Sequence, residues 1–355
     1  MSRNDDVLSD TRADVHAPVR EEWLSLVQEP LMVPDTQVVD AHHHLWERPN
    51  NTYLASEFLR DLDSVPAVVA TVYVQCRSEY LAEGPEELRP AGEVRFARAT
   101  ADSVAVERPG AAKVCQSIVA GADLMLGREV ARVLDVLEEE SAGRLRGVRN
   151  QTAWHNDSRV MSSPFPPAPD RLLQGAFKEG VRTLAARGLS LDIWAYHSQL
   201  EQVTALARAC PDTAIVVDHL GGPLGVGPYL NARKEVFDQW ARHITVLAEQ
   251  PNVYMKISGA GMRVFGFGFD AHPTPPGSDE LAHAMSPYVS HCLDTFGPKR
   301  CMFASNFPVD KGMFSYRVLW NAFSKIAAPL SSDEQRHLFH KTADSVYRLG
   351  LPLSA

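Results

Sequence analysis

The sequence has few cysteines and no motif that would pair them. Its five cysteines are odd in number and widely spaced, and no C-x-x-C pair occurs. This pattern argues against a disulfide framework and against a thiolate metal motif. Several of the cysteines lie inside apolar runs, where a free thiol behaves as a small core residue. We therefore expect a chain that works in a reducing compartment, the cytoplasm.

The sequence also lacks a long apolar run and an excess of positive charge. The longest apolar run, residues 65–76, is too short to span a bilayer, and the first 23 residues hold no signal-peptide core. Acidic residues outnumber basic ones by 44 to 35, which gives a net charge of −9. Nucleic acids and anionic membranes both attract basic surfaces. We therefore expect a small-molecule substrate and neither of those partners; a homo-oligomer is compatible with the sequence.

What the sequence does contain is a regular alternation of two kinds of segment. Short apolar runs rich in β-branched residues are typical of buried strands, and amphipathic stretches with helical spacing lie between them. The expected strands are 38–45, 68–76, 113–120, 145–154, 189–196, 214–220, 253–259 and 301–307. The clearest expected helices are 128–140, 170–188, 198–210, 235–250, 279–297 and 331–350.

Eight strand–helix units in one chain of 355 residues predict a closed (β/α)8 barrel of the α/β class. We expect a single barrel domain over residues 31–355, preceded by a short extension, residues 1–30. In the helix at 170–188, Leu173, Phe177, Val181 and Leu184 are spaced to share one buried face. Pro287 should kink or break the helix at 279–297.

One stretch, VVDAHHHLW (38–46), places three histidines at the end of the first expected strand. Side chains alternate between the two faces of a strand. His42 and His44 should therefore point into the barrel, while His43 points away from it. An inward H-x-H pair is compatible with a metal site, with a catalytic site or with a hydrogen-bonded polar strand end, and this stretch alone does not choose between them.

Other polar residues fall at the same end of the barrel. Active sites in this fold lie at the C-terminal ends of the strands. A set of thirteen histidines that places several in these few positions favours a functional site over isolated polar strand ends. The residues at these strand ends are Gln75, Arg77, Arg149, Tyr196, His197, Asp218, His219, Lys256 and Asn306, with Asp310 in the loop that follows.

Five of these segments resemble a known family. VVDAHHHLW, GVRNQTAW, VVDHLGGPLG, NVYMKISG and CMFASNFPVDK, in this order, resemble the strand motifs of the amidohydrolase superfamily. Within it, the chain is most similar to the group of 2-pyrone-4,6-dicarboxylate lactonase, L-fuconolactonase and decarboxylases of aromatic acids. The resemblance runs from Val38 to Leu349. The decarboxylases often carry E-x-H in the first motif, so H-x-H resembles the lactonases.

The resemblance implies a ligand set. It identifies His42, His44, His197 and His219 with the histidines that bind metal or substrate. Neutral imidazoles suit Zn²⁺, so a divalent metal, zinc first, is the expected cofactor. Some lactonases of the group work without metal, which leaves a metal-free site open. In that case the imidazoles and Lys256 would stabilise the oxyanion.

Asn306 departs from the family pattern, which has aspartate at this position. An amide oxygen can orient water but cannot accept a proton at neutral pH. Asp310 is therefore the nearest candidate base, and His219 is the next.

A second set of residues is expected to bind substrate. The guanidinium groups of Arg77 and Arg149 are candidates for a substrate carboxylate. Gln75 and Tyr196 line the same strand ends. Phe267, in the long irregular connection 261–280, should help to cover the site as part of a lid.

The sequence as a whole predicts a hydrolase. We expect water to attack the carbonyl of a lactone, or of a related cyclic ester or amide of a small organic acid. The alternative is a lyase that decarboxylates an aromatic or cyclic acid in the same pocket, because that reaction needs no hydrolytic water and tolerates Asn306 better.

Overall fold

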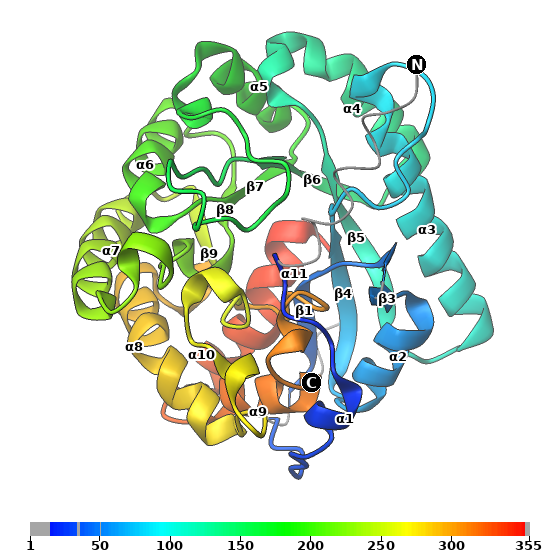
Figure 1. Ribbon diagram of the computed structural model, residues 1–355. Coiled ribbons are helices and arrows are strands. Elements are labelled where there is room, and N and C mark those ends of the chain that lie inside the picture. Colours follow the sequence, from blue (N-terminus) through cyan, green and yellow to red (C-terminus); the bar gives the residue numbers. More distant parts are fainter. Residues whose placement is uncertain (1–14, 34–35, 50, 352–355) are drawn as a thin grey trace.

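The computed structural model describes residues 15–33, 36–49 and 51–351, and its centre is a barrel of eight parallel strands (Figure 1). Each strand pairs in parallel with the next one in the order β1-β4-β5-β6-β7-β8-β9-β10. The strands are β1 (Val38–His43), β4 (Val68–Val74), β5 (Lys113–Gly121), β6 (Leu145–Gln151), β7 (Ser190–Trp194), β8 (Ile215–Val217), β9 (Val253–Ile257) and β10 (Cys301–Phe303).

The barrel closes where the first strand meets the chain that follows the last one. The amide of Asn306 donates to the carbonyl of His42 at 2.8 Å, and the amide of His44 donates to the carbonyl of Phe307 at 2.8 Å. All eight expected strands are therefore present, and the predicted (β/α)8 fold is confirmed. A small antiparallel pair, β2 (Trp46–Arg48) and β3 (Asn51–Tyr53), follows β1 at the mouth of the barrel.

Helices surround the barrel because each buries one apolar stripe against the strands (Figure 1). In the helix from Val130 to Ser141, for example, Val133, Leu134 and Leu137 are fully buried. The described helices are α1 (Glu21–Leu24), α2 (Ala55–Asp63), α3 (Pro90–Glu107), α4 (Val130–Ser141), α5 (Gly175–Ala185), α6 (Leu200–Ala209), α7 (Arg233–Ala248), α8 (Ser278–Phe296), α9 (Tyr316–Ala327), α10 (Ser332–Arg336) and α11 (Thr342–Tyr347). No described helix combines the length and apolar character needed to cross a membrane.

One of the expected helices is wrong, and another continues through its proline. The segment 170–188 is a 3₁₀ turn followed by α5, because the backbone of Gln174 is extended between them; Leu173 is consequently 40% exposed. Helix α8 runs through Pro287 without a break. Pro287 lies on the exposed face, while Met285 and Val289 are buried on either side of it, so packing against the barrel holds both halves in one helix.

The C-terminal segment fills the barrel interior from the end opposite the histidines. Tyr347, Leu349 and Leu351 pack among small apolar residues of the strands. The Ser117 hydroxyl donates to the carbonyl of Tyr347 at 2.9 Å, which fixes α11 against β5. Figure 1 shows α11 at the centre of the barrel. A residue of the last helix can thus reach the underside of the site.

Candidate active site

Strand β1 delivers two histidines to the mouth of the barrel. The Nε2 atoms of His42 and His44 lie 3.2 Å apart, and their rings are nearly perpendicular. His43 faces outward, where its ring stacks on Phe58 and its Nε2 pairs with the hydroxyl of Thr71 at 2.9 Å. The two-residue alternation predicted this arrangement, and the structure confirms it.

The end of β8 adds a third histidine and a carboxylate. The His219 ring lies 4.7 Å from the His42 ring, and its Nδ1 pairs with the hydroxyl of Ser258 at 2.8 Å. His42, Asp218 and His219 each offer a ligand atom, and these three atoms lie within 4.8 Å of one another. His42, His44, Asp218 and His219 are together called the histidine cluster below.

Burial keeps the imidazoles of the cluster neutral. Desolvation is the largest cause that lowers the pKa of His42, His44 and His219 well below the usual histidine value. The positive charge of Lys256 adds to this effect on the pKa of His42, and that of Arg149 adds to it on the pKa of His44. Neutral imidazole is the form that binds a metal ion.

The hydrogen-bond partners indicate where the ring lone pairs point. His44 Nδ1 must carry a proton, since it pairs with the carbonyl of Val74 at 2.7 Å; its Nε2 therefore has a lone pair. Cationic donors face both ring nitrogens of His42, with Arg149 Nη1 at 3.1 Å from Nε2 and Lys256 Nζ at 3.3 Å from Nδ1. The single proton of the neutral ring fits on Nδ1, which faces Asp218 Oδ1 at 3.4 Å, because Lys256 donates to Asp192 at the shorter distance of 2.6 Å. His42 Nε2 then accepts from Arg149. Two nitrogen lone pairs then face each other at 3.2 Å, an arrangement that favours a cation between them.

The spacing fits zinc. Two nitrogen ligands on a tetrahedral zinc, each bonded at about 2.0–2.1 Å, lie about 3.3–3.4 Å apart. The observed 3.2 Å is close to that value. Neither carboxylate oxygen of Asp218 has a hydrogen-bond partner among the described residues, although Oδ1 lies 3.4 Å from both the Lys256 ammonium and His42 Nδ1. Asp218 therefore offers a carboxylate oxygen to a cation, while Lys256 already balances part of its charge. His42, Asp218 and His219, whose ligand atoms lie within 4.8 Å of one another, would hold the ion, with His44 Nε2 beside His42 Nε2 at 3.2 Å. Arg149 would have to leave His42 Nε2.

The contacts of Lys256 argue against the oxyanion role expected of it in a metal-free site. Its ammonium lies 2.6 Å from Asp192 Oδ2 and 3.4 Å from Asp218 Oδ1, and all three side chains are fully buried. A lysine held between two carboxylates has little donor capacity left for a substrate. Its contacts instead balance the negative charges beneath the histidine cluster.

His197 lies outside the histidine cluster, contrary to expectation. Strand β7 ends at Trp194, so His197 falls in the following 3₁₀ turn. Its Nδ1 accepts from the amide of Leu224 at 3.3 Å, and its ring lies against Tyr229. His197 is thus engaged in holding the loop after β8, which explains why it does not join the other histidines.

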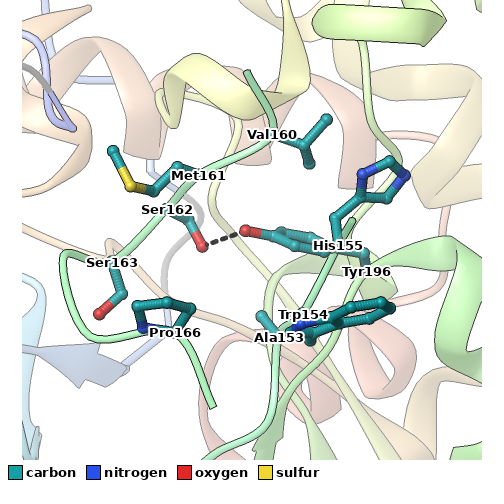
Figure 2. A pocket seen from close by; sticks show the side chains of 9 residues that line it. All are labelled: Ala153, Trp154, His155, Val160, Met161, Ser162, Ser163, Pro166 and Tyr196. Carbon is teal, nitrogen blue, oxygen red and sulfur yellow. Dashed lines mark hydrogen bonds between the residues drawn. The ribbon is translucent and has the colours of Figure 1, made fainter. Parts of the chain in front are cut away.

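Tyr196 lines a small hollow together with residues of the loop after β6, among them Ser162 (Figure 2). Its hydroxyl meets that of Ser162 at 2.7 Å, and Ser162 also accepts from the indole of Trp194 at 2.9 Å. The Trp194 ring in turn packs edge-on to His219 at 4.9 Å. The hollow holds about 20 Å³, enough for about one water molecule. Tyr196 therefore reaches the cluster through Ser162 and Trp194.

The remaining expected substrate residues are spread between the site and the rim. Gln75 is buried, and its Oε1 has no partner among the described residues. Arg77 is exposed, and its guanidinium lies over the ring of Phe165 at 4.4 Å. Phe267 stacks on Phe269 and lies under the guanidinium of Arg233, on α7. These contacts of Phe267 favour packing on the outer helices over a lid.

Asn306 and Asp310 form a buried pair after β10. Asn306 Nδ2 donates to Asp310 Oδ1 at 2.8 Å, while Asn306 Oδ1 and Asp310 Oδ2 have no partner among the described residues. Burial raises the pKa of Asp310 to about 7. Asp310 is not a surface charge paired with Lys311, since Lys311 pairs with Asp61 at 2.8 Å. A carboxyl that titrates near neutrality can act as a general base.

Comparison with known proteins agrees with this geometry. Residues 39–349 match the family described as Amidohydrolase. The chain belongs to the amidohydrolase family. It is 31% identical over 337 residues to an uncharacterised protein, y4mH, of Sinorhizobium fredii (89% of this chain, 99% of the relative). It is 27% identical over 328 residues to an L-fucono-1,5-lactonase of Burkholderia multivorans (89% and 98%).

A solved structure shows the same fold. An amidohydrolase from Burkholderia multivorans, crystallised with bound zinc, superposes with a TM-score of 0.66 at 23% identity. The match covers 89% of this chain and 100% of that one.

Sequence reasoning missed two residues of this amidohydrolase site. The sequence pattern indicates Asp218 only as a residue at a strand end and not as a ligand, and it indicates Asp192 only as part of an apolar strand. The sequence does contain one signal for Asp192. An aspartate within a buried apolar run, such as Asp192 in LSLDIWAY, needs a partner of opposite charge in the barrel interior. The lysine in NVYMKISG supplied that partner, and only the fold brings the two strands together.

Proposed function

We propose that this amidohydrolase opens the lactone ring of a small sugar acid or related organic acid by hydrolysis. The observation that carries the proposal is the pair of facing lone pairs on His42 and His44, next to His219 and Asp218 in the mouth of the barrel. A relative named L-fucono-1,5-lactonase supports the substrate class.

In this proposal, residues of the chain carry out proton transfer and substrate binding. When bound, a zinc ion polarises a carbonyl and lowers the pKa of coordinated water. Asp310, with its pKa raised to about 7, takes the proton from the attacking water and returns it to the ring oxygen as the acyl C–O bond breaks. Arg149, once displaced from His42, binds a substrate hydroxyl or carboxylate.

The proposal is tested with a panel of lactones and zinc-loaded protein. L-fucono-1,5-lactone, other aldonolactones and 2-pyrone-4,6-dicarboxylate are followed by acid release, with the spontaneous opening of each lactone subtracted. We expect turnover of at least one, with one ¹⁸O from labelled water in the product. His44→Gln should lower kcat/KM by about 100-fold or more, because the loss of a residue that only orients a metal ligand commonly costs 10–100-fold.

His43→Leu is the matched control, because His43 is the adjacent histidine on the outer face. It should lower the melting temperature through the lost Thr71 and Phe58 contacts and leave kcat/KM near the wild-type value. If zinc-loaded protein opens none of the lactones above background, the proposed function is wrong.

A second candidate, a decarboxylase, is favoured by one residue. Asn306 stands where the family has aspartate, and an amide cannot take a proton from water. Loss of CO₂ from an aromatic or cyclic acid requires no such step. Release of ¹³CO₂ from a labelled carboxylic acid, without ¹⁸O uptake, would support this function over lactone hydrolysis.

A further inference from the structure

A buried chain of polar contacts connects the C-terminal helix to the underside of the histidine cluster. The hydroxyl of Tyr347, on α11, donates to Asp192 Oδ2 at 2.8 Å, and Lys256 Nζ lies 2.6 Å from the same oxygen. Lys256 Nζ is also 3.3 Å from His42 Nδ1 and 3.4 Å from Asp218 Oδ1. All of these residues are fully buried.

The position of the lysine charge matters for a metal site. An ammonium beside a cation is repelled by it, and this repulsion is weakly screened where water is excluded. The lysine side chain is a flexible stem, so its partners decide where the charge lies. Asp192 holds the Lys256 ammonium at 2.6 Å, closer than His42 at 3.3 Å or Asp218 at 3.4 Å, and the hydroxyl of Tyr347 fixes the carboxylate that does so.

We propose that Tyr347 is a positioning residue for the zinc site and acts through Asp192 and Lys256 on His42 and Asp218. The C-terminal helix thereby contributes to a site at the opposite end of the barrel. The inference rests on the proposed function only in that the histidine cluster holds zinc, and it does not depend on the lactone.

The molecule contains a matched control. Tyr53 donates to Asp61 Oδ2 at 2.6 Å, and Lys311 Nζ lies 2.8 Å from the same oxygen. The lysine lies 5.3 Å from the Tyr53 ring, as Lys256 lies 5.1 Å from that of Tyr347. The two Tyr–Asp–Lys groups have the same chemistry, and the second has no described contact with His42, His44, Asp218 or His219.

The experiment compares Tyr347→Phe with Tyr53→Phe in the full-length chain. Each variant loses one tyrosine–carboxylate hydrogen bond, buried at Tyr347 and partly buried at Tyr53, and keeps its ring, so both should lower the melting temperature. Zinc affinity is measured by competition with a chromogenic chelator. We expect Tyr347→Phe to weaken zinc binding by about tenfold, the lower end of the usual range for an outer-shell partner, and Tyr53→Phe to leave it within twofold of wild type.

Asp192→Asn extends the series and should weaken zinc binding further, by up to about 100-fold. If that variant does not fold, the two tyrosine variants still decide. Equal zinc affinities in Tyr347→Phe and Tyr53→Phe overturn the inference, as does a wild-type chain that binds no zinc.

Lactone turnover is measured on the same samples. A selective loss of zinc affinity in Tyr347→Phe, without turnover of any lactone by the wild type, sustains the positioning role while the proposed function falls. If the wild type opens a lactone but the two tyrosine variants bind zinc equally well, the proposed function stands and the positioning role of Tyr347 is wrong.

Discussion

Asp310 shows how a single carboxyl is tuned by its surroundings. It is fully buried, and desolvation is the largest cause of its raised pKa, which hydrogen bonds from Asn306 and from the amides of Gly259 and Gly261 oppose. A Cβ at Gly261 would lie 2.6 Å from the Asp310 Cα, so only glycine permits this approach. The close packing of the loop after β9 thereby keeps Asp310 buried and its pKa near 7.

Asp310→Asn should abolish most of the activity if Asp310 is the base. A general base is commonly worth 10²–10⁴-fold, so we expect kcat to fall by about 100-fold or more. The wild-type rate should rise as pH increases through about 7, where Asp310 loses its proton. A pH–rate profile of both proteins checks this, and an unchanged kcat in the variant would show that the base lies elsewhere.

The same raised pKa predicts a pH dependence of stability. Between about pH 4 and about pH 7, the folded chain keeps a proton on Asp310 that the unfolded chain has released. The free energy of unfolding should therefore fall as pH rises across this window, by at most ~4 kcal/mol from this group. Asp310→Asn removes the effect, so urea unfolding of metal-free protein should show the variant gaining on wild type between pH 5 and pH 8. If the difference in unfolding free energy between variant and wild type were the same at pH 5 and pH 8, the predicted effect of Asp310 would be contradicted.

Asn306→Asp restores the carboxylate of the family pattern. The residue is in the left-handed backbone region, which aspartate also tolerates, so the fold should persist. The Asn306 amide now lies 2.8 Å from Asp310 Oδ1. An aspartate carboxylate in its place would lie equally close, so the two carboxyl groups would share a proton. We expect tighter zinc binding by chelator competition. If zinc affinity and rate both stay at wild-type values, the end of β10 takes no part in the chemistry.

At the scale of elements, the segment 15–24 crosses the mouth of the barrel. The His16 ring stacks on Trp46, which stacks on His44 at 5.8 Å. Further along, the indole of Trp23 donates to the carbonyl of His272 at 3.1 Å. The segment thus bridges the loops after β1 and β9, and the site beneath it is closed: His44 is 3% exposed.

Trp23→Ala should loosen this cover. We expect a chelator in excess to strip zinc from the variant several-fold faster than from wild type, with little change in equilibrium affinity, because no ligand is altered. Phe267→Ala is the matched control on the same connection, since Phe267 packs against Arg233 and Tyr288. It should lower the melting temperature and leave both the stripping rate and KM unchanged. Equal stripping rates in Trp23→Ala and wild type would mean that access is controlled elsewhere.

At the scale of the whole molecule, local pattern predicted the fold better than the site. The eight strands follow from apolar runs, and the orientation of His42, His43 and His44 follows from alternation within one strand. The position of His197 depends on where β7 ends, a boundary decided by tertiary packing. The partnership of Asp192 with Lys256 joins residues 64 positions apart, which no local pattern encodes.

The ligands of the histidine cluster come from strands on different parts of the barrel, so zinc should stabilise the whole domain. His42 lies in β1, His44 directly follows that strand, and His219 follows β8. A metal that binds only the folded chain raises the unfolding free energy by RT ln(1 + [Zn]/Kd). At 100 times Kd this amounts to about 2.7 kcal/mol. Thermal unfolding of wild type should therefore shift upward with zinc, whereas His44→Gln should shift much less and His43→Leu should shift as wild type does. If zinc shifts the melting temperature of His44→Gln as much as that of wild type, the stabilising ion binds outside the histidine cluster. The chemistry proposed for the mouth of the barrel would then be wrong as well.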